Sequence, residues 1–173
     1  MNEVINNILT RRSVRSFTDK KVSKEDIELL IKAGLSAPSG MNLQTWKFTG
    51  VLNSNKIKEL ADVVGKAWNR EGYNFYDPTA LIIISNEKDS RFGREDDAAA
   101  LQNIFLAAHS IGIGSVWINQ LNNENSDKEE IRKVLNTLEI PENHTIYGIA
   151  ALGYQADEPK GMVDKIGTYT IIE

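Results

Sequence analysis

The sequence of 173 residues contains no cysteine and only two histidines, His109 and His144. Without cysteine the chain has no disulfide, no thiolate nucleophile and no cysteine-ligated metal or iron–sulfur centre. Two histidines are too few for a histidine-rich metal site, so we expect no bound metal. Because His109 lies in an alanine-rich stretch, we interpret it as a structural residue.

Long hydrophobic runs are also missing. No apolar run approaches the ~20 residues that a membrane-spanning helix needs, and the N-terminal "MNEVINNILTRR" lacks the pattern of a signal peptide. The chain has neither a dinucleotide-binding glycine motif nor a GxxxxGK[ST] phosphate loop. With 24 acidic and 20 basic residues, its net charge of −4 argues against general nucleic-acid binding. We therefore expect a cytoplasmic protein that uses neither a membrane nor a nucleic acid.

Apolar residues recur at helical or strand spacing along the whole chain. The spacing predicts helices over residues 2–10, 23–34, 54–64, 96–111 and 126–138, with Ser23, Ser54 and the pair Ser126 and Glu129 as N-terminal caps. Strands are predicted at 46–52, 80–85, 114–119 and 145–154, and a short β-type segment at 168–172. Because helices and strands mix without a regular βαβ rhythm, we expect one α+β domain over residues 1–173.

The segment 96–111 differs from the other predicted helices because it has almost no polar face. A helix that is apolar nearly all round is buried, either in a core or in a subunit interface. We expect both for this helix. The acidic pair Asp96 and Asp97 at its start is interpreted as complementing the helix dipole.

Positive charge is concentrated near the N-terminus, in "RRSVRSF" at residues 11–17. Between Arg11 and Lys24 the chain has six basic residues and one acidic residue. These cations can serve a helix C-terminus, whose exposed carbonyls and dipole attract positive charge. Alternatively, the guanidinium forks and the Ser13 hydroxyl can bind a phosphate. The residues alone leave both interpretations open.

A second unusual stretch, "SAPSGMNLQTWKF" at residues 36–48, joins a predicted helix to a predicted strand. Its composition is that of a turn, but it is crowded with amides and hydroxyls. Asn42 and Gln44 can each offer a donor and an acceptor to a planar heterocycle. A turn needs neither amide, so we favour a ligand contact.

Four segments in this order resemble the nitroreductase family of flavin enzymes. They are "RRSVR", "APSGMNLQTWKF", "DDAAALQNIFLAAHSIGIGSVWIN" and "ALGYQADEPK". The first two are similar to the family patterns R-R-S-x-R and A-P-S-x-x-N-x-Q-P-W. The resemblance covers nearly the whole chain, and it implies a mixed, mainly antiparallel central sheet flanked by helices. It also implies a homodimer with the buried helix at its interface and a C-terminal strand that reaches the partner.

The resemblance also implies how the chain would bind FMN. The positions that match the family's phosphate site are Arg11, Arg12, Ser13, Arg15 and Lys160. The positions that line the isoalloxazine from the partner subunit are Pro38, Ser39, Gly40, Asn42 and Gln44. The end of the strand after the buried helix lies near the flavin N5 in the family, which here corresponds to Ile118, Asn119 and Gln120.

The implied activity is electron transfer from NADH or NADPH, through FMN, to a small organic acceptor by a ping-pong mechanism. The cofactor carries such chemistry, so no protein nucleophile is needed and we assign no catalytic side chain. Nitroaromatics, quinones, enones and free flavins all remain open as acceptors. The choice between NADH and NADPH also remains open.

Two positions depart from the family pattern. Thr45 stands where the family has proline, which we expect to change the turn and not the site. Gly161 follows Lys160 where the family commonly has arginine, and the next cation is Lys165. We expect either a weaker phosphate clamp at that end or substitution by Lys165.

Three alternatives stand beside the enzyme. The same residues would serve a flavin-binding sensor or carrier without turnover, and only bleaching of the flavin by NADH or NADPH separates the two. A nucleic-acid binder using residues 11–24 is less favoured, because the patch lacks interleaved aromatics. A phosphate-binding enzyme without flavin is less favoured because it leaves the polar 38–44 loop unexplained.

Overall fold

A computed structural model describes residues 2–157 and 165–173 of the chain. In chain order its elements are α1 (Glu3–Thr10), α2 (Lys24–Leu35), η1 (Gly40–Asn42), β1 (Trp46–Val51), α3 (Ser54–Ala67), β2 (Ala80–Glu87), α4 (Gly93–Ser110), β3 (Gly114–Ile118), η2 (Asn123–Asp127), α5 (Glu129–Thr137) and β4 (His144–Gly153). The elements alternate irregularly between helix and strand, as expected for an α+β protein.

The four strands form one sheet in the order β1-β2-β4-β3, and every neighbouring pair is antiparallel. The expected mixed character is limited, within the described residues, to an isolated parallel bridge between Ser13 and Ser115. The central strands β2 and β4 are buried almost along their whole length. Their continuous apolar runs follow from this position, because both faces of the sheet are covered.

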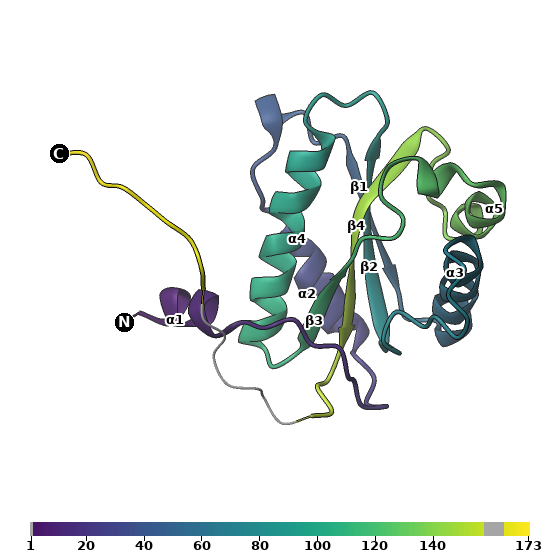
Figure 1. Ribbon diagram of the computed structural model, residues 1–173, viewed down its shortest axis with the longest axis horizontal. Helices are drawn as coiled ribbons and strands as arrows, with labels where there is room; N and C mark the ends of the chain where they lie inside the picture. The colour runs from purple at the N-terminus through teal and green to yellow at the C-terminus, as the bar shows by residue number, and fades with distance from the viewer. Residues whose placement is uncertain (1, 158–164) are drawn as a thin grey trace.

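Helices cover both faces of the sheet (Figure 1). Because side chains alternate along a strand, Leu81 and Ile83 point to the face of α3 and α5, where they join one core cluster. Ile82 and Ile84 point to the opposite face, where they join a second cluster with α2 and α4. The sheet therefore separates two apolar layers, and each layer has its own pair of helices.

Most predicted elements are present with boundaries shifted by a few residues. For example, α4 begins at Gly93 instead of residue 96 and ends at Ser110. Ser23 caps α2 as expected, since its Oγ accepts a hydrogen bond from the Asp26 N–H. Residues 168–172 are exposed and belong to no strand of this chain, so a strand added to a partner stays a prediction.

Two predicted caps are wrong. The cap of α3 is Asn53, whose Oδ1 accepts the N–H groups of Asn55 and Lys56, and not Ser54. Ser126 does not cap α5 either, because it lies in η2 and its buried hydroxyl is 3.2 Å from the Thr145 hydroxyl. At α3 the neighbouring residue Asn53 accepts the N–H groups that Ser54 was expected to cap. At α5 the expected capping hydroxyl, that of Ser126, lies instead beside Thr145, a residue distant from the helix start.

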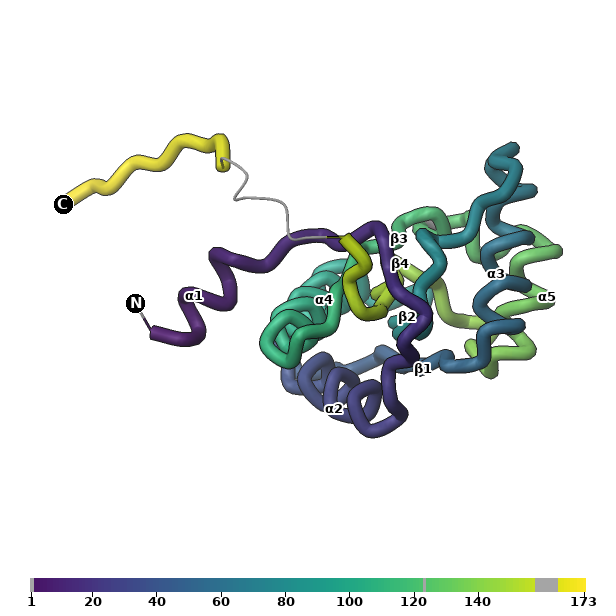
Figure 2. The backbone as a smooth tube through the Cα atoms, turned by 90° about the horizontal axis from the view of Figure 1, so that it is seen from below, coloured from purple at the N-terminus to yellow at the C-terminus, as the bar shows by residue number. Residues whose placement is uncertain are grey.

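Residues 13–22 form a strap that crosses one end of the sheet, and Figure 2 views it from below. Val14 N–H donates to Ser115 O of β3, Thr18 N–H donates to Tyr154 O after β4, and Val22 N–H donates to Thr79 Oγ1 before β2. The strap lies so close to the sheet that a Cβ on Gly114 would come within 2.9 Å of the Val14 side chain. The strap thus fixes the arginine-rich segment against the end of the sheet.

The two ends of the chain lie at the margin of the layered body, and α1 contacts α4 through the bond from Asn7 Nδ2 to Leu106 O (Figures 1 and 2). Helix α1 has no buried residue, and its apolar side chains Val4, Ile5, Ile8 and Leu9 are 45–65% exposed. In the tail, Ile166, Tyr169, Ile171 and Ile172 are more exposed still. Within the described residues, no helix combines the length and apolarity needed to span a bilayer.

Candidate functional site

The arginine-rich segment begins where α1 ends. Arg11 is the C-terminal cap of α1, and its N–H donates to Asn7 O. Two residues later the strap pairs with β3 through the bridge between Ser13 and Ser115. Arg11 and Arg12 are half-buried, whereas Ser13 and Arg15 are exposed. The structure thus brings four of the five predicted phosphate-site residues to the same end of β3, and the fifth, Lys160, lies outside the described residues.

Each arginine has a different environment. The Arg11 guanidinium lies 5.8 Å from the centre of the Phe105 ring of α4, and that of Arg15 lies 5.9 Å from the Tyr76 ring. Arg12 Nη1 donates to Leu9 O at 2.9 Å and to Arg11 O at 2.7 Å. Arg12 therefore serves the C-terminal end of α1. Its Nε, however, is buried and has no hydrogen-bond partner among the described residues.

Positive charge accumulates here without compensation. Among the described residues, no carboxylate forms an ion pair with any of the three arginines. Burial, and then the adjacent Arg12, lowers the pKa of Arg11. Burial, followed by Arg11 and Arg12, also lowers the pKa of His109, whose Nε2 lies 2.9 Å from Thr10 Oγ1. Guanidinium groups, a hydroxyl and an orphaned buried N–H are donors that suit a phosphate dianion.

The amide-rich loop lies at the other end of the sheet, before β1. Its side chains Pro38, Asn42 and Gln44 are exposed, and Ser39 and Gly40 are half-buried. The loop is tied internally, because Ser39 Oγ accepts the Gln44 N–H at 3.0 Å and Gln44 Nε2 donates to Asn42 Oδ1 at 2.8 Å. The amides therefore face outward in a folded turn, where they can meet a planar ligand.

The end of β3 contributes less than predicted. The Ile118 side chain is only 1% exposed and belongs to the core under α3 and α5, so Ile118 offers a ligand only its backbone. Asn119 is exposed, and its N–H donates to Gln120 Oε1 at 3.1 Å. Gln120 O accepts the indole N–H of Trp68 at the end of α3. Asn119 and Gln120 are thus the residues of this group with polar side chains near the surface.

One chain does not bring all the predicted residues together. Asn119 follows Ser115 by four residues, which is about 13 Å along a strand. The loop contacts α4 at Asp96 and Arg11 contacts it at Phe105, positions separated by about 14 Å along the helix. The arginines and the amide loop therefore lie toward opposite ends of α4. Lys160 lies outside the described residues, and Lys165 is exposed.

The sequence did not reveal the buried environment of two acidic residues near the loop. Asp96 and Asp97, which we expected merely to complement the dipole of α4, are 4% and 0% exposed. Asp96 Oδ1 accepts the Gly40 N–H at 2.8 Å. Asp97 Oδ1 accepts a hydrogen bond from Asn86 Nδ2 at 2.8 Å. Adjacent carboxylates at a helix start gave no signal of this burial.

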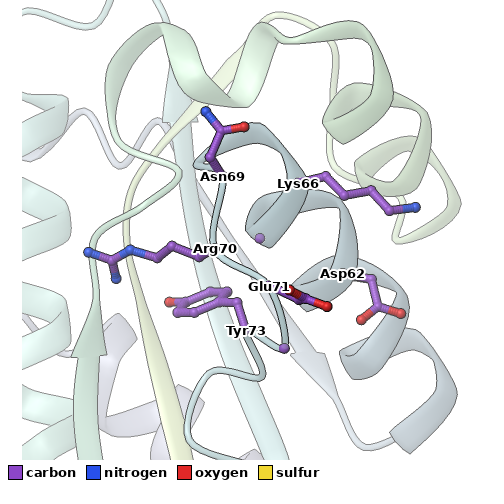
Figure 3. A pocket seen from close by; sticks show the side chains of 8 residues that line it. Asp62, Lys66, Asn69, Arg70, Glu71 and Tyr73 are labelled. Atoms are coloured by element: carbon purple, nitrogen blue, oxygen red, sulfur yellow. The ribbon is translucent and has the colours of Figure 1, made fainter.

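A separate hollow of about 670 Å³ lies at the C-terminal end of α3 (Figure 3). It is lined by Asp62, Gly65, Lys66, Asn69, Arg70, Glu71, Gly72 and Tyr73. None of the predicted site residues is among them, and α3 covers the face of the sheet opposite α4. Burial raises the pKa of Tyr73 to about 12. This hollow is therefore not the site predicted from the sequence.

The fold and the site define an α+β protein with a cationic cluster at one end of an antiparallel sheet and an amide-rich loop at the other. Residues 8–154 match the Nitroreductase family, and the chain belongs to that family. A nitroreductase from Bacteroides fragilis, solved with bound FMN, is 40% identical and superimposes with a TM-score of 0.94 over 100% of both chains.

Two relatives carry more specific names. An NADPH-flavin oxidoreductase from Vibrio harveyi is 32% identical over 92% of this chain and 69% of its own length. An FMN reductase (NADPH) from Bacillus subtilis is 28% identical over 91% of this chain and 68% of its own length. The names of both relatives thus include a flavin and the nicotinamide cofactor NADPH.

Proposed function

We propose that this chain is an FMN-dependent oxidoreductase that transfers electrons from NADH or NADPH to a small organic acceptor. The observation that carries the proposal is the cluster of Arg11, Arg12 and Arg15 beside Ser13, which has no carboxylate partner among the described residues. Family membership and the FMN-bound Bacteroides fragilis relative support the choice of ligand.

In this proposal the arginine cluster and the Ser13 hydroxyl hold the FMN phosphate. Arg12 Nε is the donor best suited to this role, because it is buried and has no partner among the described residues. The aromatic rings beneath Arg11 and Arg15 orient the two guanidinium groups. Lys160 stays a predicted fifth member, with Lys165 as its alternative.

Bound FMN supplies the hydride and electron chemistry. The protein binds and orients the ring, and Asn42 and Gln44 provide amide donors and acceptors for its polar edge. Hydrogen-bond donors at that edge stabilise negative charge on the ring. Asn119 and Gln120 would line the site from β3. The nicotinamide donor and the acceptor use the same site in turn, so the donor leaves before the acceptor binds.

We extend the proposal to a homodimer in which each site combines residues of two copies. Within one chain the arginines and the loop are separated by about 14 Å along α4. If two copies pack their α4 helices antiparallel, the loop of one copy lies beside the arginines of the other. The face of α4 with Ala98 and Leu106 is only half-buried in one chain, which leaves apolar surface for a partner.

Helix α1 and the C-terminal tail support the same arrangement. Both carry exposed apolar side chains and lie at the margin of the layered body (Figure 2). Isolated apolar surface of this extent is typical of an interaction surface. The tail can also add a strand to the sheet of a partner, as the family resemblance implies. Because reduced nicotinamide cofactors are held inside cells, the proposal includes a cytoplasmic location.

The direct experiment is spectroscopic. We expect the purified protein to be yellow, to release FMN on heating, and to lose its flavin absorbance anaerobically when NADH or NADPH is added. A colourless protein that takes up no added FMN would contradict the proposal. A yellow protein that neither nicotinamide bleaches would instead be a flavin-binding carrier or sensor. Oxidation of the bleached protein by nitroaromatics, quinones, enones and free flavins would then identify the class of acceptor.

A further inference from the structure

Two buried carboxylates at the start of α4 are only partly satisfied. Asp96 and Asp97 each use one oxygen as a hydrogen-bond acceptor. The second oxygen of each, Oδ2, is buried without a hydrogen-bond partner among the described residues. Buried polar atoms without partners are rare and costly, so such a pair requires an explanation. A role limited to the helix dipole does not explain it, because an exposed carboxylate would serve the dipole equally well.

The loop that these carboxylates contact has a strained backbone. Met41, Asn42 and Gln44 have φ values of 53°, 57° and 51°, in the left-handed region that residues with a Cβ seldom adopt. Such conformations persist only where surrounding structure holds them, and they are common at ligand-binding sites. The bonds within the loop join Ser39, Asn42 and Gln44 to one another but do not attach the loop to the protein.

The first attachment is at Gly40. Its N–H donates to Asp96 Oδ1 at 2.8 Å. A Cβ on this residue would lie 2.3 Å from Cγ of Phe92, the residue before α4, so the loop sits directly on that ring. Asp96 thus draws the strained part of the loop against the start of α4, and only glycine can make the approach.

The second attachment is at Thr45. Its hydroxyl donates to Asn86 Oδ1 at 2.6 Å, and Asn86 Nδ2 donates to Asp97 Oδ1 at 2.8 Å. The Asn86 side chain therefore bridges Asp97 and the C-terminal end of the loop, because it donates to the Asp97 carboxylate and accepts from the Thr45 hydroxyl. Proline, which the family pattern has at position 45, has no hydroxyl for this bond. The two adjacent carboxylates consequently hold both ends of the segment that carries Asn42 and Gln44.

We infer that Asp96 and Asp97 are positioning residues of the flavin site, which hold loop 38–45 in the conformation that receives the isoalloxazine ring. The inference rests on the proposed function. It assigns the buried carboxylates a role in ligand binding through Gly40 and Thr45, and not through contact with the flavin. It also gives Thr45 a purpose in the site, whereas the sequence alone predicted that it would change only the turn.

The variants Asp96→Ala and Thr45→Val test the two attachments. Without flavin, we expect amide hydrogen exchange at residues 40–45 to become about tenfold faster or more in both variants. Asp96→Ala removes the acceptor of the Gly40 N–H, and Thr45→Val removes the hydroxyl that donates to Asn86. With flavin, we expect weaker binding of FMN and riboflavin by a similar factor and a shifted visible spectrum. Asp96→Asn keeps an oxygen for the Gly40 N–H and should restore loop protection and the spectrum.

Asp62→Ala on the exposed surface of α3 is the matched control and should leave every readout unchanged. The inference is wrong if folded Asp96→Ala and Thr45→Val both keep wild-type exchange at 40–45 and the wild-type flavin spectrum. It is also wrong if Asp96→Asn loses as much as Asp96→Ala. If Asp96→Ala does not fold, hydrogen exchange and the flavin spectrum of Thr45→Val test the inference alone. Failure of the wild-type protein to bind FMN would contradict the proposed function, while exchange in the flavin-free protein would still test the attachments.

Discussion

At the scale of single residues, Arg12 has a structural role at the end of α1 and a proposed role in binding the phosphate. Its Nη1 donates to two carbonyls at the end of α1, but its buried Nε has no partner among the described residues. Hydrogen bonds to charged groups contribute about 1.5–3 kcal/mol. We therefore expect Arg12→Ala to weaken FMN binding by roughly ten- to a hundredfold in a fluorescence titration.

Riboflavin, which lacks the phosphate, provides the control for the same variant. Its affinity should change little in Arg12→Ala, because the lost donor addresses only the phosphate. Arg70→Ala, on the exposed surface beside the hollow of Figure 3, should change neither affinity. If Arg12→Ala weakens riboflavin as much as FMN, the cluster does not act through the phosphate.

Asp97 predicts an unusual dependence of stability on pH. Burial raises the pKa of Asp97 to about 7 from an ordinary value of 3.8, the Asn86 hydrogen bond opposes the rise, and Asp96 adds to it. The folded protein therefore keeps a proton that the unfolded chain loses near pH 4. This contribution to stability is complete below about pH 4 and is lost as the pH rises through about 7.

The variant Asp97→Asn should remove this loss, since an uncharged amide has no proton to lose and still offers an oxygen to Asn86. In denaturant unfolding we expect it to match the wild type near pH 4. Near pH 8 we expect it to be more stable by up to roughly 4 kcal/mol. Asp62→Asn on the exposed surface of α3 should follow the wild type at both values. Parallel wild-type and Asp97→Asn curves across this range would contradict the assignment.

At the scale of elements, α4 is the helix on which the proposed dimer depends. Leu106 is half-buried in one chain, on a helix whose sequence has almost no polar face. Burying an unpaired charge at an interface costs several kcal/mol, which raises a dimer dissociation constant at least about a hundredfold. We expect Leu106→Glu to be a monomer by light scattering and to lose FMN.

The matched control for this change is Leu52→Glu, which introduces the same side chain at an exposed position before α3. It should remain a dimer that binds FMN. Should Leu106→Glu remain a dimer with bound FMN, α4 would not form the interface. A wild-type protein that is monomeric with flavin bound would have the same consequence.

The elements show which information the sequence holds locally. The strands at 80–85 and 145–154 were predictable because continuous apolar runs require cover on both faces. The sequence could not show that Ser126 does not cap α5, because its hydroxyl lies beside Thr145, which belongs to β4. The burial and contacts of Asp96 and Asp97 were hidden for the same reason. Gly40 is 56 positions from Asp96, and only the folded sheet brings the loop to α4.

The candidate site likewise has one part that the local sequence indicates and one part that depends on contacts between distant segments. Arg11, Arg12 and Ser13 form one continuous segment, so the sequence alone showed their charge and hydroxyl as a candidate phosphate site. The left-handed backbone at Met41, Asn42 and Gln44 was not visible, because the contacts that hold it come from β2 and α4. Strand alternation turns the Ile118 side chain into the core, so the predicted contact at this position can come only from its backbone.

At the scale of the whole molecule, the central question is whether one chain contains a complete site. The loop and the arginines meet α4 about 14 Å apart along its axis, so in one chain the residues proposed for the ring and those proposed for the phosphate lie toward opposite ends of this helix. An antiparallel pair of α4 helices removes this separation. The composite site that we propose combines the geometry of this helix with two-fold symmetry.

A heterodimer of two defective copies tests this arrangement. Arg12→Glu reverses a charge in the proposed phosphate site, and Gly40→Val displaces the loop because a Cβ there would meet the Phe92 ring at 2.3 Å. Each homodimer should bind no FMN. If every site takes its arginines from one copy and its loop from the other, a heterodimer isolated with two different affinity tags carries both defects in one site and none in the other. It should bind one FMN per dimer and be bleached by the nicotinamide. If each site belonged to a single chain, both copies would be defective and the heterodimer would bind none.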